Sequence, residues 1–94
     1  SWPDDAHDDP WPVRYADLDV LGHVNNAAQW VAVEEALDRA GWDRGPVRAE
    51  LEHGPGVDRS PDVRLRWAPV DGGVDTWLTT DGVVGSVARV RPLG

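Results

Sequence analysis

Five amino acids are absent from the chain: cysteine, methionine, lysine, isoleucine and phenylalanine. The absence of cysteine excludes disulfides, thiolate metal ligands and a cysteine nucleophile. No apolar run approaches the roughly 18 residues that a membrane-spanning helix needs, and no signal-peptide hydrophobic region is visible. A cytoplasmic protein is therefore expected. Because the sequence begins with Ser1 and contains no methionine, we also expect a fragment or a processed product.

The charge balance is strongly acidic. Seventeen Asp and Glu residues against nine Arg residues give a formal net charge of −8. A nucleic-acid-binding domain normally carries a basic face, so this balance argues against that class of function. The length of 94 residues corresponds to one domain. Such a short chain buries a smaller fraction of its surface than a larger domain does, which makes it marginally stable on its own.

The first twelve residues are rich in Asp, Pro and Trp and show no periodicity of 2 or 3.6. This composition predicts an acidic linker or arm over residues 1–12, followed by a single domain over residues 13–94. An acidic docking tail is the alternative, with Trp2 and Trp11 available to pin it to a groove.

One helix is expected, over Ala27–Ala40. Apolar side chains recur at helical spacing through this segment, and Gly41 directly after it is a typical residue for a helix C-terminus. Extended segments with alternating apolar residues are expected at 13–18, 47–53, 63–67, 74–80 and 83–91. The dipeptide Asp81-Gly82 predicts a two-residue hairpin turn of type I′. The order of one strand, one helix and four strands favours an antiparallel sheet covered on one face by the helix.

The stretch from Asp17 to Asn26 gathers two carboxylates, an imidazole and two amides immediately before the helix. Asn26 is a typical N-cap, and Gln29 three residues later completes a capping-box pattern. The first backbone N–H groups of a helix have no intrahelical partner, so they form a site for an oxyanion at the positive end of the helix dipole. A carboxylate and an imidazole beside such a site are the groups that acyl-transfer hydrolysis requires.

The segment Asp-Leu-Asp-x-x-x-His-x-Asn-Asn, with Arg14-Tyr15 upstream and a helix downstream, resembles the hotdog-fold thioesterases. It is most similar to the C-terminal hotdog unit of the acyl-ACP thioesterases, whose signature contains Asp-x-Asn-x-His-x-Asn-Asn. The similarity is dense over Arg14 to Leu37 and loose beyond. It implies an α+β hotdog fold, in which a five-stranded antiparallel sheet wraps around one central helix. It also implies hydrolysis of acyl-ACP or acyl-CoA thioesters to a free fatty acid and a carrier thiol.

The resemblance assigns roles to four residues. Asp19 matches the catalytic Asp and would act as a general base on water or attack the thioester carbonyl itself. His23 would polarise the carbonyl or position water. Asn25 and Asn26 would brace the loop and cap the helix, with the backbone N–H of Asn26 as the oxyanion donor. Purely structural roles remain open, since an Asp in a turn usually satisfies loop amides and a His beneath a helix end is often a brace.

The chain departs from the family pattern at two positions. Leu21 stands where the acyl-ACP enzymes carry Asn, and Leu cannot donate or accept a hydrogen bond. The family's Glu on the strand after the helix falls near Gly56, although Glu52 lies four residues away. These departures keep open a second hypothesis, a non-catalytic hotdog half with a structural or acyl-binding role in a tandem or dimeric assembly.

Three further expectations concern ligands and partners. His7, His23 and His53 show no metal-ligand spacing, so no metal and no cofactor are expected. The Arg residues that alternate along the strands form either a solvated face or a basic patch for an acidic carrier or pantetheine phosphate. The side chains of six Trp residues cannot all be buried under one helix. Trp67 or Trp77 is therefore expected at an interface with a second hotdog unit, in a homodimer or in the same chain.

Overall fold

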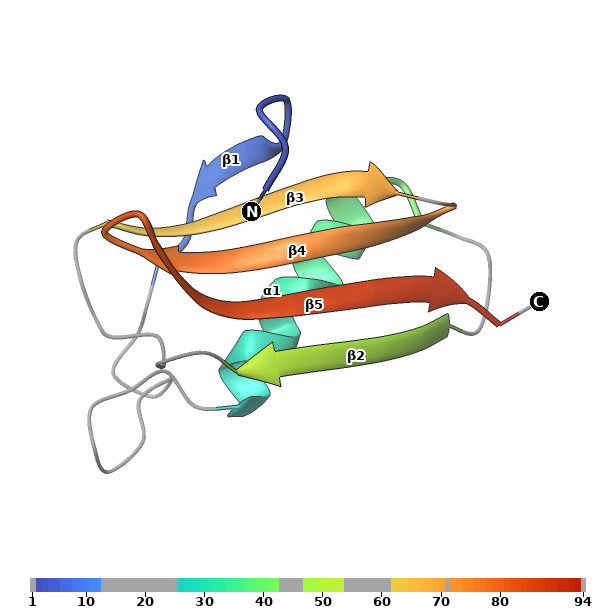
Figure 1. The fold of residues 1–94 in the computed structure, drawn as a ribbon. Helices are drawn as coiled ribbons and strands as arrows, with labels where there is room; N and C mark the ends of the chain where they lie inside the picture. Colours follow the sequence, from blue (N-terminus) through green and yellow to red (C-terminus); the bar gives the residue numbers. More distant parts are fainter. Residues whose placement is uncertain (1, 13–25, 43–46, 54–61, 71, 94) are drawn as a thin grey trace.

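A computed structural model describes residues 2–12, 26–42, 47–53, 62–70 and 72–93. One helix and five strands follow each other as β1 (His7–Pro10), α1 (Asn26–Arg39), β2 (Val47–His53), β3 (Val63–Val70), β4 (Gly73–Thr80) and β5 (Val83–Pro92). The strands form one sheet in the order β1-β3-β4-β5-β2, and every neighbouring pair is antiparallel. The helix lies across one face of this sheet (Figure 1). The predicted hotdog arrangement is confirmed.

Tight turns connect the central strands. Asp81 and Gly82 both have positive φ angles, 51° and 81°, as a type I′ turn requires. The hairpin predicted between β4 and β5 is therefore confirmed. Gly73 at the start of β4 has a different role, because a Cβ on it would lie 1.9 Å from the backbone oxygen of Val90 on β5. Only glycine allows the two strands to approach this closely.

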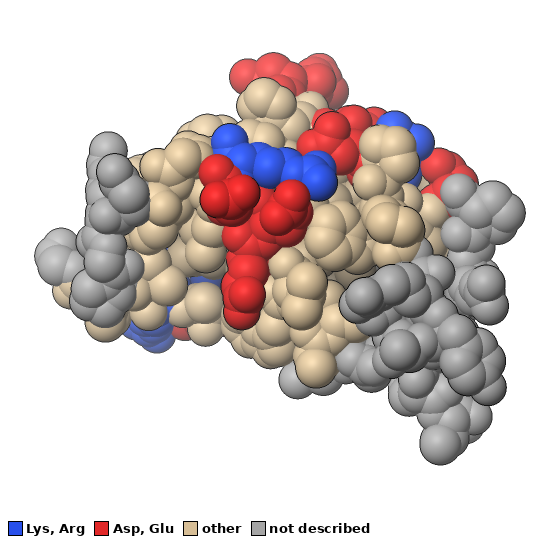
Figure 2. Space-filling view, turned by 180° about the vertical axis from the view of Figure 1, so that it is seen from behind, with Lys and Arg blue, Asp and Glu red and all other residues tan. Residues whose placement is uncertain are grey.

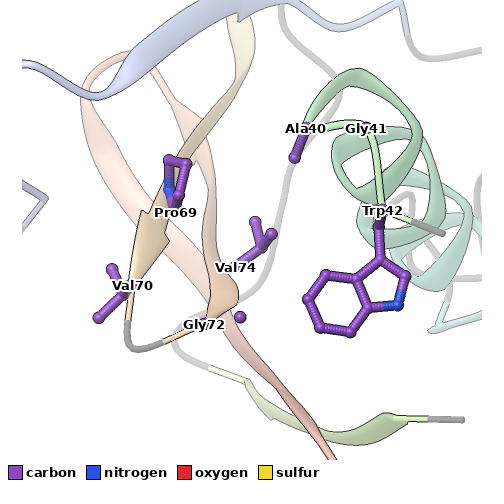
Figure 3. Close-up of a pocket in the computed structure, with 8 residues that line it drawn as sticks. Ala40, Gly41, Trp42, Pro69, Val70, Gly72 and Val74 are labelled. Carbon is purple, nitrogen blue, oxygen red and sulfur yellow. The ribbon is translucent and has the colours of Figure 1, made fainter. Parts of the chain in front are cut away.

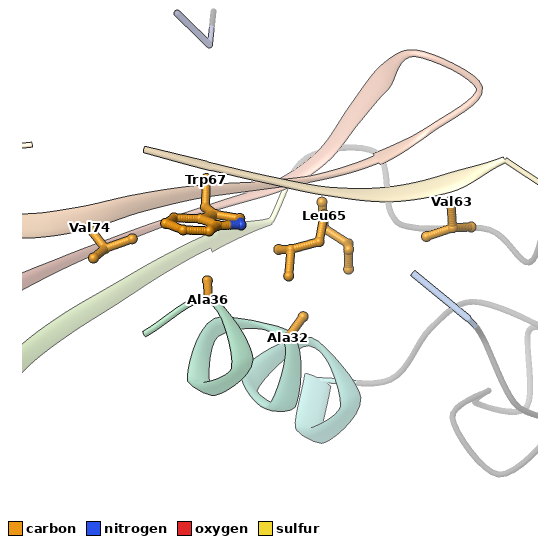
Figure 4. Packing of buried hydrophobic residues seen from close by; sticks show 7 residues of the cluster. Ala32, Ala36, Val63, Leu65, Trp67 and Val74 are labelled. Atoms are coloured by element: carbon orange, nitrogen blue, oxygen red, sulfur yellow. The ribbon is translucent and has the colours of Figure 1, made fainter. Parts of the chain in front are cut away.

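The main core lies between α1 and the centre of the sheet. Ala32 and Ala36 are buried on the helix, and their small side chains let the helix lie close to the strands. Figure 4 shows Leu65 and Trp67 pointing from β3 towards these two alanines. Burying a side chain such as that of Leu65 contributes roughly 1.5–3 kcal/mol. This packing sets the position of α1 on the sheet, and thereby the position of its first turn.

The C-terminus of α1 is a Schellman motif. Gly41 has a φ angle of 74°, the N–H of Trp42 donates to the carbonyl of Leu37 at 3.0 Å, and the N–H of Gly41 donates to that of Asp38 at 3.0 Å. The side chains of Leu37 and Trp42 both pack against the main core, as such motifs usually require. The prediction of Gly41 as the terminating residue is confirmed, although α1 begins and ends one residue earlier than expected.

The N-terminal segment requires a correction. Residues His7–Pro10 lie inside the stretch assigned to a linker or arm, yet they form the edge strand β1 and pair with β3. The strand predicted at 13–18 lies outside the described residues. Local composition disfavours a strand at His-Asp-Asp-Pro, and contacts distant in sequence overcome this. The His7 ring stacks on Trp67 with centroids 4.0 Å apart, and Asp9 accepts a hydrogen bond from Arg39 at 2.8 Å.

The expectation that Trp67 or Trp77 lies at an interface is wrong. Both side chains are 6% exposed within the single chain. Trp67 belongs to the core beneath α1, whereas Trp77 lies opposite Arg66 on the other face of the sheet. The large apolar side chains that remain exposed in the described residues are those of Val31, Val83 and Leu93. Among the residues that the structure describes, no helix is long and apolar enough to cross a membrane.

Candidate functional site

The predicted catalytic stretch ends where α1 begins. Asn26 is the first residue of the helix. Asp19, His23 and Asn25 lie outside the described residues, so their roles remain predictions. The structure brings the C-terminal end of this stretch to the first turn of a helix that is packed against the sheet, as the sequence predicted.

The first turn of α1 contains no acidic side chain, so no Asp or Glu of that turn offsets the positive end of the helix dipole. The opposite end carries Arg39, which complements the negative end of the dipole. The positive end of a helix dipole attracts negative charge, such as a carboxylate or the oxyanion of a tetrahedral intermediate. The helix start thus has the electrostatic character that the predicted chemistry requires.

The burial of Gln29 was not predicted from the sequence. Its side chain is 5% exposed, and its predicted capping role involves groups outside those that the structure describes. The only hint in the sequence is its spacing of three and four residues from the core residues Ala32 and Val33, which places all three on one helix face. A buried amide next to the helix start adds polar character beneath the first turn.

The second face of the sheet holds paired charges. Asp8 contacts both Arg64 and Arg66, and Arg66 also lies under the Trp2 ring at 4.3 Å. The remaining strand arginines make ion pairs with acidic neighbours, namely Arg48 with Glu50, Arg89 with Glu52 and Arg91 with Asp75. The hydrogen bond that Arg64 donates to Asp8 raises the pKa of Arg64. Each Arg of the described strands is thus neutralised, which favours the solvated face over an open basic patch.

The charged side chains on the face that carries α1 are mostly acidic. Figure 2 shows Asp and Glu side chains gathered around an Arg on this face. Arg39 contacts Asp9 at 2.8 Å and Glu35 at 3.1 Å. The hydrogen bond from Arg39, assisted by one from the Trp67 indole, holds the pKa of Asp9 below its ordinary value. Asp9 therefore links β1 to both α1 and β3. In the sequence, it precedes the segment that leads to the predicted catalytic stretch.

A cavity of about 260 Å³ lies at the C-terminal end of α1. Figure 3 shows the six-membered ring of Trp42 facing it from one side and Val74 from the other. The helix has 14 residues. Because an α-helix rises 1.5 Å per residue, the cavity lies about 20 Å from the helix start. The cavity therefore lies away from the first turn of α1.

Among the described residues, no group of three His, Asp or Glu side chains is arranged to hold a metal ion. The region around His23 lies outside them. The absence of a metal therefore remains a prediction from the sequence.

The chain was compared with known families and curated proteins. The family model described as the acyl-ACP thioesterase C-terminal domain matches residues 2–77. Two uncharacterized proteins of Mycobacterium tuberculosis, MT2057 of strain CDC 1551 / Oshkosh and Rv2001 of strain H37Rv, are each 29% identical over 89 residues. The match covers 95% of this chain and 36% of each relative. The chain thus spans about a third of the length of these proteins.

Solved structures share the fold. A thioesterase from Thermus thermophilus, complexed with coenzyme A and Zn, gives a TM-score of 0.71 at 20% identity, over 96% of this chain and 85% of that one. A probable thioesterase from Bartonella henselae gives 0.61 at 17% identity, over 90% and 87%. At these identities the likeness establishes the fold alone.

Proposed function

Because the chain belongs to the acyl-ACP thioesterase C-terminal domain family, we propose that it hydrolyses acyl thioesters to a free fatty acid and a carrier thiol. The observation that carries this proposal is the family match over residues 2–77, which includes the whole stretch from Asp17 to Asn26. The absence of an acidic side chain from the first turn of α1, directly after this stretch, supports it, since the positive end of the helix dipole would stabilise an oxyanion there.

In the proposed mechanism Asp19 is the base. Its carboxylate takes a proton from water as the water oxygen attacks the thioester carbonyl carbon. His23 polarises the carbonyl, and the backbone N–H of Asn26 donates to the oxygen as it becomes negative. The tetrahedral intermediate then breaks its C–S bond, and the thiolate leaves and takes up a proton. Direct attack by Asp19, with an acyl-enzyme anhydride that water then hydrolyses, is the variant of this mechanism.

The substrate is proposed to be an acyl chain on acyl carrier protein or on coenzyme A, and the reaction to take place in the cytoplasm. The ion pairs of the strand arginines leave no open basic patch on the described sheet, so docking of the carrier would depend on other residues. A second hotdog unit, as a homodimer or in the same chain, is proposed to complete the site.

A non-catalytic role is the alternative, in which this unit binds acyl groups or supports a catalytic neighbour. Leu21 favours it, because a side chain without hydrogen-bonding groups stands where the family signature has an amide. The length of the curated relatives is also compatible with it, because they have room for a second unit of this size.

Replacement of Asp19 tests the proposed function. Asp19→Asn should lower turnover of an acyl-CoA substrate by about 10²–10⁴-fold, the contribution typical of a positioned base. Asp17→Asn is the matched control, because it makes the same change two residues earlier, at a residue to which the resemblance assigns no catalytic role. The released thiol can be measured with a thiol-reactive dye without background, since the protein has no cysteine. Equal rates for wild type and Asp19→Asn would remove Asp19 from the mechanism.

A further inference from the structure

The cavity at the C-terminal end of α1 has a buried floor and an exposed rim. Val74 on β4 is 2% exposed and Gly73 beside it is buried, so these two residues form the floor. Gly41, Pro69 and Gly72 are exposed and form the rim. The volume of about 260 Å³ corresponds to that of about nine water molecules. A small molecule can therefore enter from solvent and reach buried apolar groups.

The chemistry of the lining restricts what this molecule is. The described residues that line the cavity carry no charged side chain: Ala40, Gly41, Trp42, Pro69, Val70, Gly72, Gly73 and Val74. None of these side chains is a hydrogen-bond acceptor either. A primary ammonium would lose its water here without gaining side-chain acceptors for its N–H groups, and burying unpaired donors is costly. The lining therefore suits a group that makes apolar contacts and has no N–H to satisfy.

The electrostatic field at the cavity favours a cation. Ala40 and Gly41 follow directly after the last residue of α1, so the cavity lies at the negative end of the helix dipole. Arg39, the basic residue of the last turn, is held by Asp9 at 2.8 Å and by Glu35 at 3.1 Å. The formal net charge of −8 contributes a field of the same sign. A cation is attracted to this end of the molecule, and an anion is disfavoured.

Trp42 supplies an aromatic surface for such a cation. Its six-membered ring faces the cavity from the side opposite Val74 (Figure 3). Among aromatic side chains Trp attracts cations most strongly, and quaternary ammonium groups are typical ligands of such rings. The buried Nε1 of Trp42 has no hydrogen-bond partner in the described part of the chain, so no hydrogen bond there fixes the ring. The ring can adjust to a ligand while it stays packed against the main core.

We propose that this cavity binds a small ligand through a quaternary ammonium group, with the methyl groups packed against Trp42, Val70 and Val74. The lining provides the apolar contacts, and the indole ring and the helix end attract the charge. The same features disfavour anions and primary amines. The cavity lies about 20 Å from the start of the 14-residue helix, so this site does not depend on the thioester hydrolysis proposed above.

Choline is the probe for this site. Its neutral isostere neohexanol, in which a carbon atom replaces the charged nitrogen, is the matched control. In nuclear magnetic resonance titrations at constant ionic strength, choline should shift the indole N–H of Trp42 and the amide of Gly72, with a Kd in the millimolar range expected for so small a ligand. Neohexanol should bind about fivefold more weakly, because the ring and the helix end do not attract it.

Three results would overturn the proposal. Absence of these shifts at about 100 mM choline, far above a millimolar Kd, would refute the site. Equal affinity for choline and neohexanol would refute the preference for a cation. Ethanolamine has the charge of choline but N–H groups in place of the methyl groups, so binding as tight as that of choline would refute the preference for a quaternary ammonium.

Charge variants of Val70 test the field while the aromatic ring is kept. Val70 is half-buried at the cavity. Val70→Glu should strengthen choline binding by about fivefold and Val70→Arg should weaken it by a similar factor, since each places a charge within a few ångströms of the ligand. Val70→Gln is the matched control and should bind choline as the wild type does. Equal effects of the two charges on choline and neohexanol would contradict the electrostatic argument.

Removal of the ring tests the aromatic contact. Trp42→Leu should weaken choline binding by about fivefold or more. Trp2→Leu is the control, because the Trp2 ring lies over Arg66 of β3, and it should bind choline normally. Trp42 also contributes to the core, so Trp42→Phe provides a second variant that keeps an aromatic ring and should retain binding. A folded Trp42→Leu protein with wild-type affinity for choline would refute the proposed contact.

Discussion

Gly73 gives the sharpest test of how the strands pack. In Gly73→Ala, the new Cβ would lie 1.9 Å from the Val90 oxygen and 2.9 Å from the Val90 carbonyl carbon. Both atoms belong to the backbone of β5, so relief requires a shift of a whole strand. Overpacking of this kind costs about 1–3 kcal/mol, and a clash with backbone belongs at the upper end of this range. In most strand positions the same change would be stabilising by roughly 0.5–1 kcal/mol.

Urea unfolding followed by tryptophan fluorescence measures this effect, since Trp67 and Trp77 are buried in the sheet. For a chain of this size the dependence on urea is about 1 kcal/mol per molar, so the midpoint should fall by about 2–3 M. Gly72→Ala is the control. A Cβ there meets no atom within 4 Å, and the change costs only the positive φ of 76°, about 1–2 kcal/mol. An unchanged midpoint for Gly73→Ala would refute the close approach of β4 and β5.

Two further predictions concern the catalytic stretch and β1. If the missing amide limits catalysis, Leu21→Asn should raise turnover, by up to the roughly 10²–10³-fold that one well-placed polar donor contributes; a folded variant with unchanged kcat would indicate a network built without this group. The pKa of Asp9 is lowered in the folded state, chiefly by its hydrogen bond with Arg39. The stability that this ion pair contributes is therefore present above the unfolded pKa near 3.8, and it is lost as the pH falls through the lower pKa of the folded state. Asp9→Asn should therefore destabilise the protein at neutral pH and have little effect at acid pH, and a loss that is independent of pH would contradict this ion pair.

The helix, the four strands that follow it and the Asp81-Gly82 turn could be predicted from the sequence because each depends on local patterns. Apolar spacing distinguishes a helix from a strand, and Gly41 marks a helix end because it tolerates positive φ. The same local signals failed at the N-terminus. His-Asp-Asp-Pro has no strand pattern, and β1 forms because Trp67, Arg39 and the arginines of β3 offer partners distant in the sequence.

For the candidate site, the sequence alone determined the residue types and their spacing from Asp17 to Asn26, together with the helix that follows. These depend on covalent order and on capping chemistry, which need no tertiary context. Only the tertiary structure decided which charges are neutralised, because the partners of Arg64, Arg66, Arg89 and Arg91 include residues of other strands. It also decided that Trp67 and Trp77 are buried and that β2 is an edge strand of the described sheet, because strand order is a property of the folded sheet and cannot be deduced from any one segment.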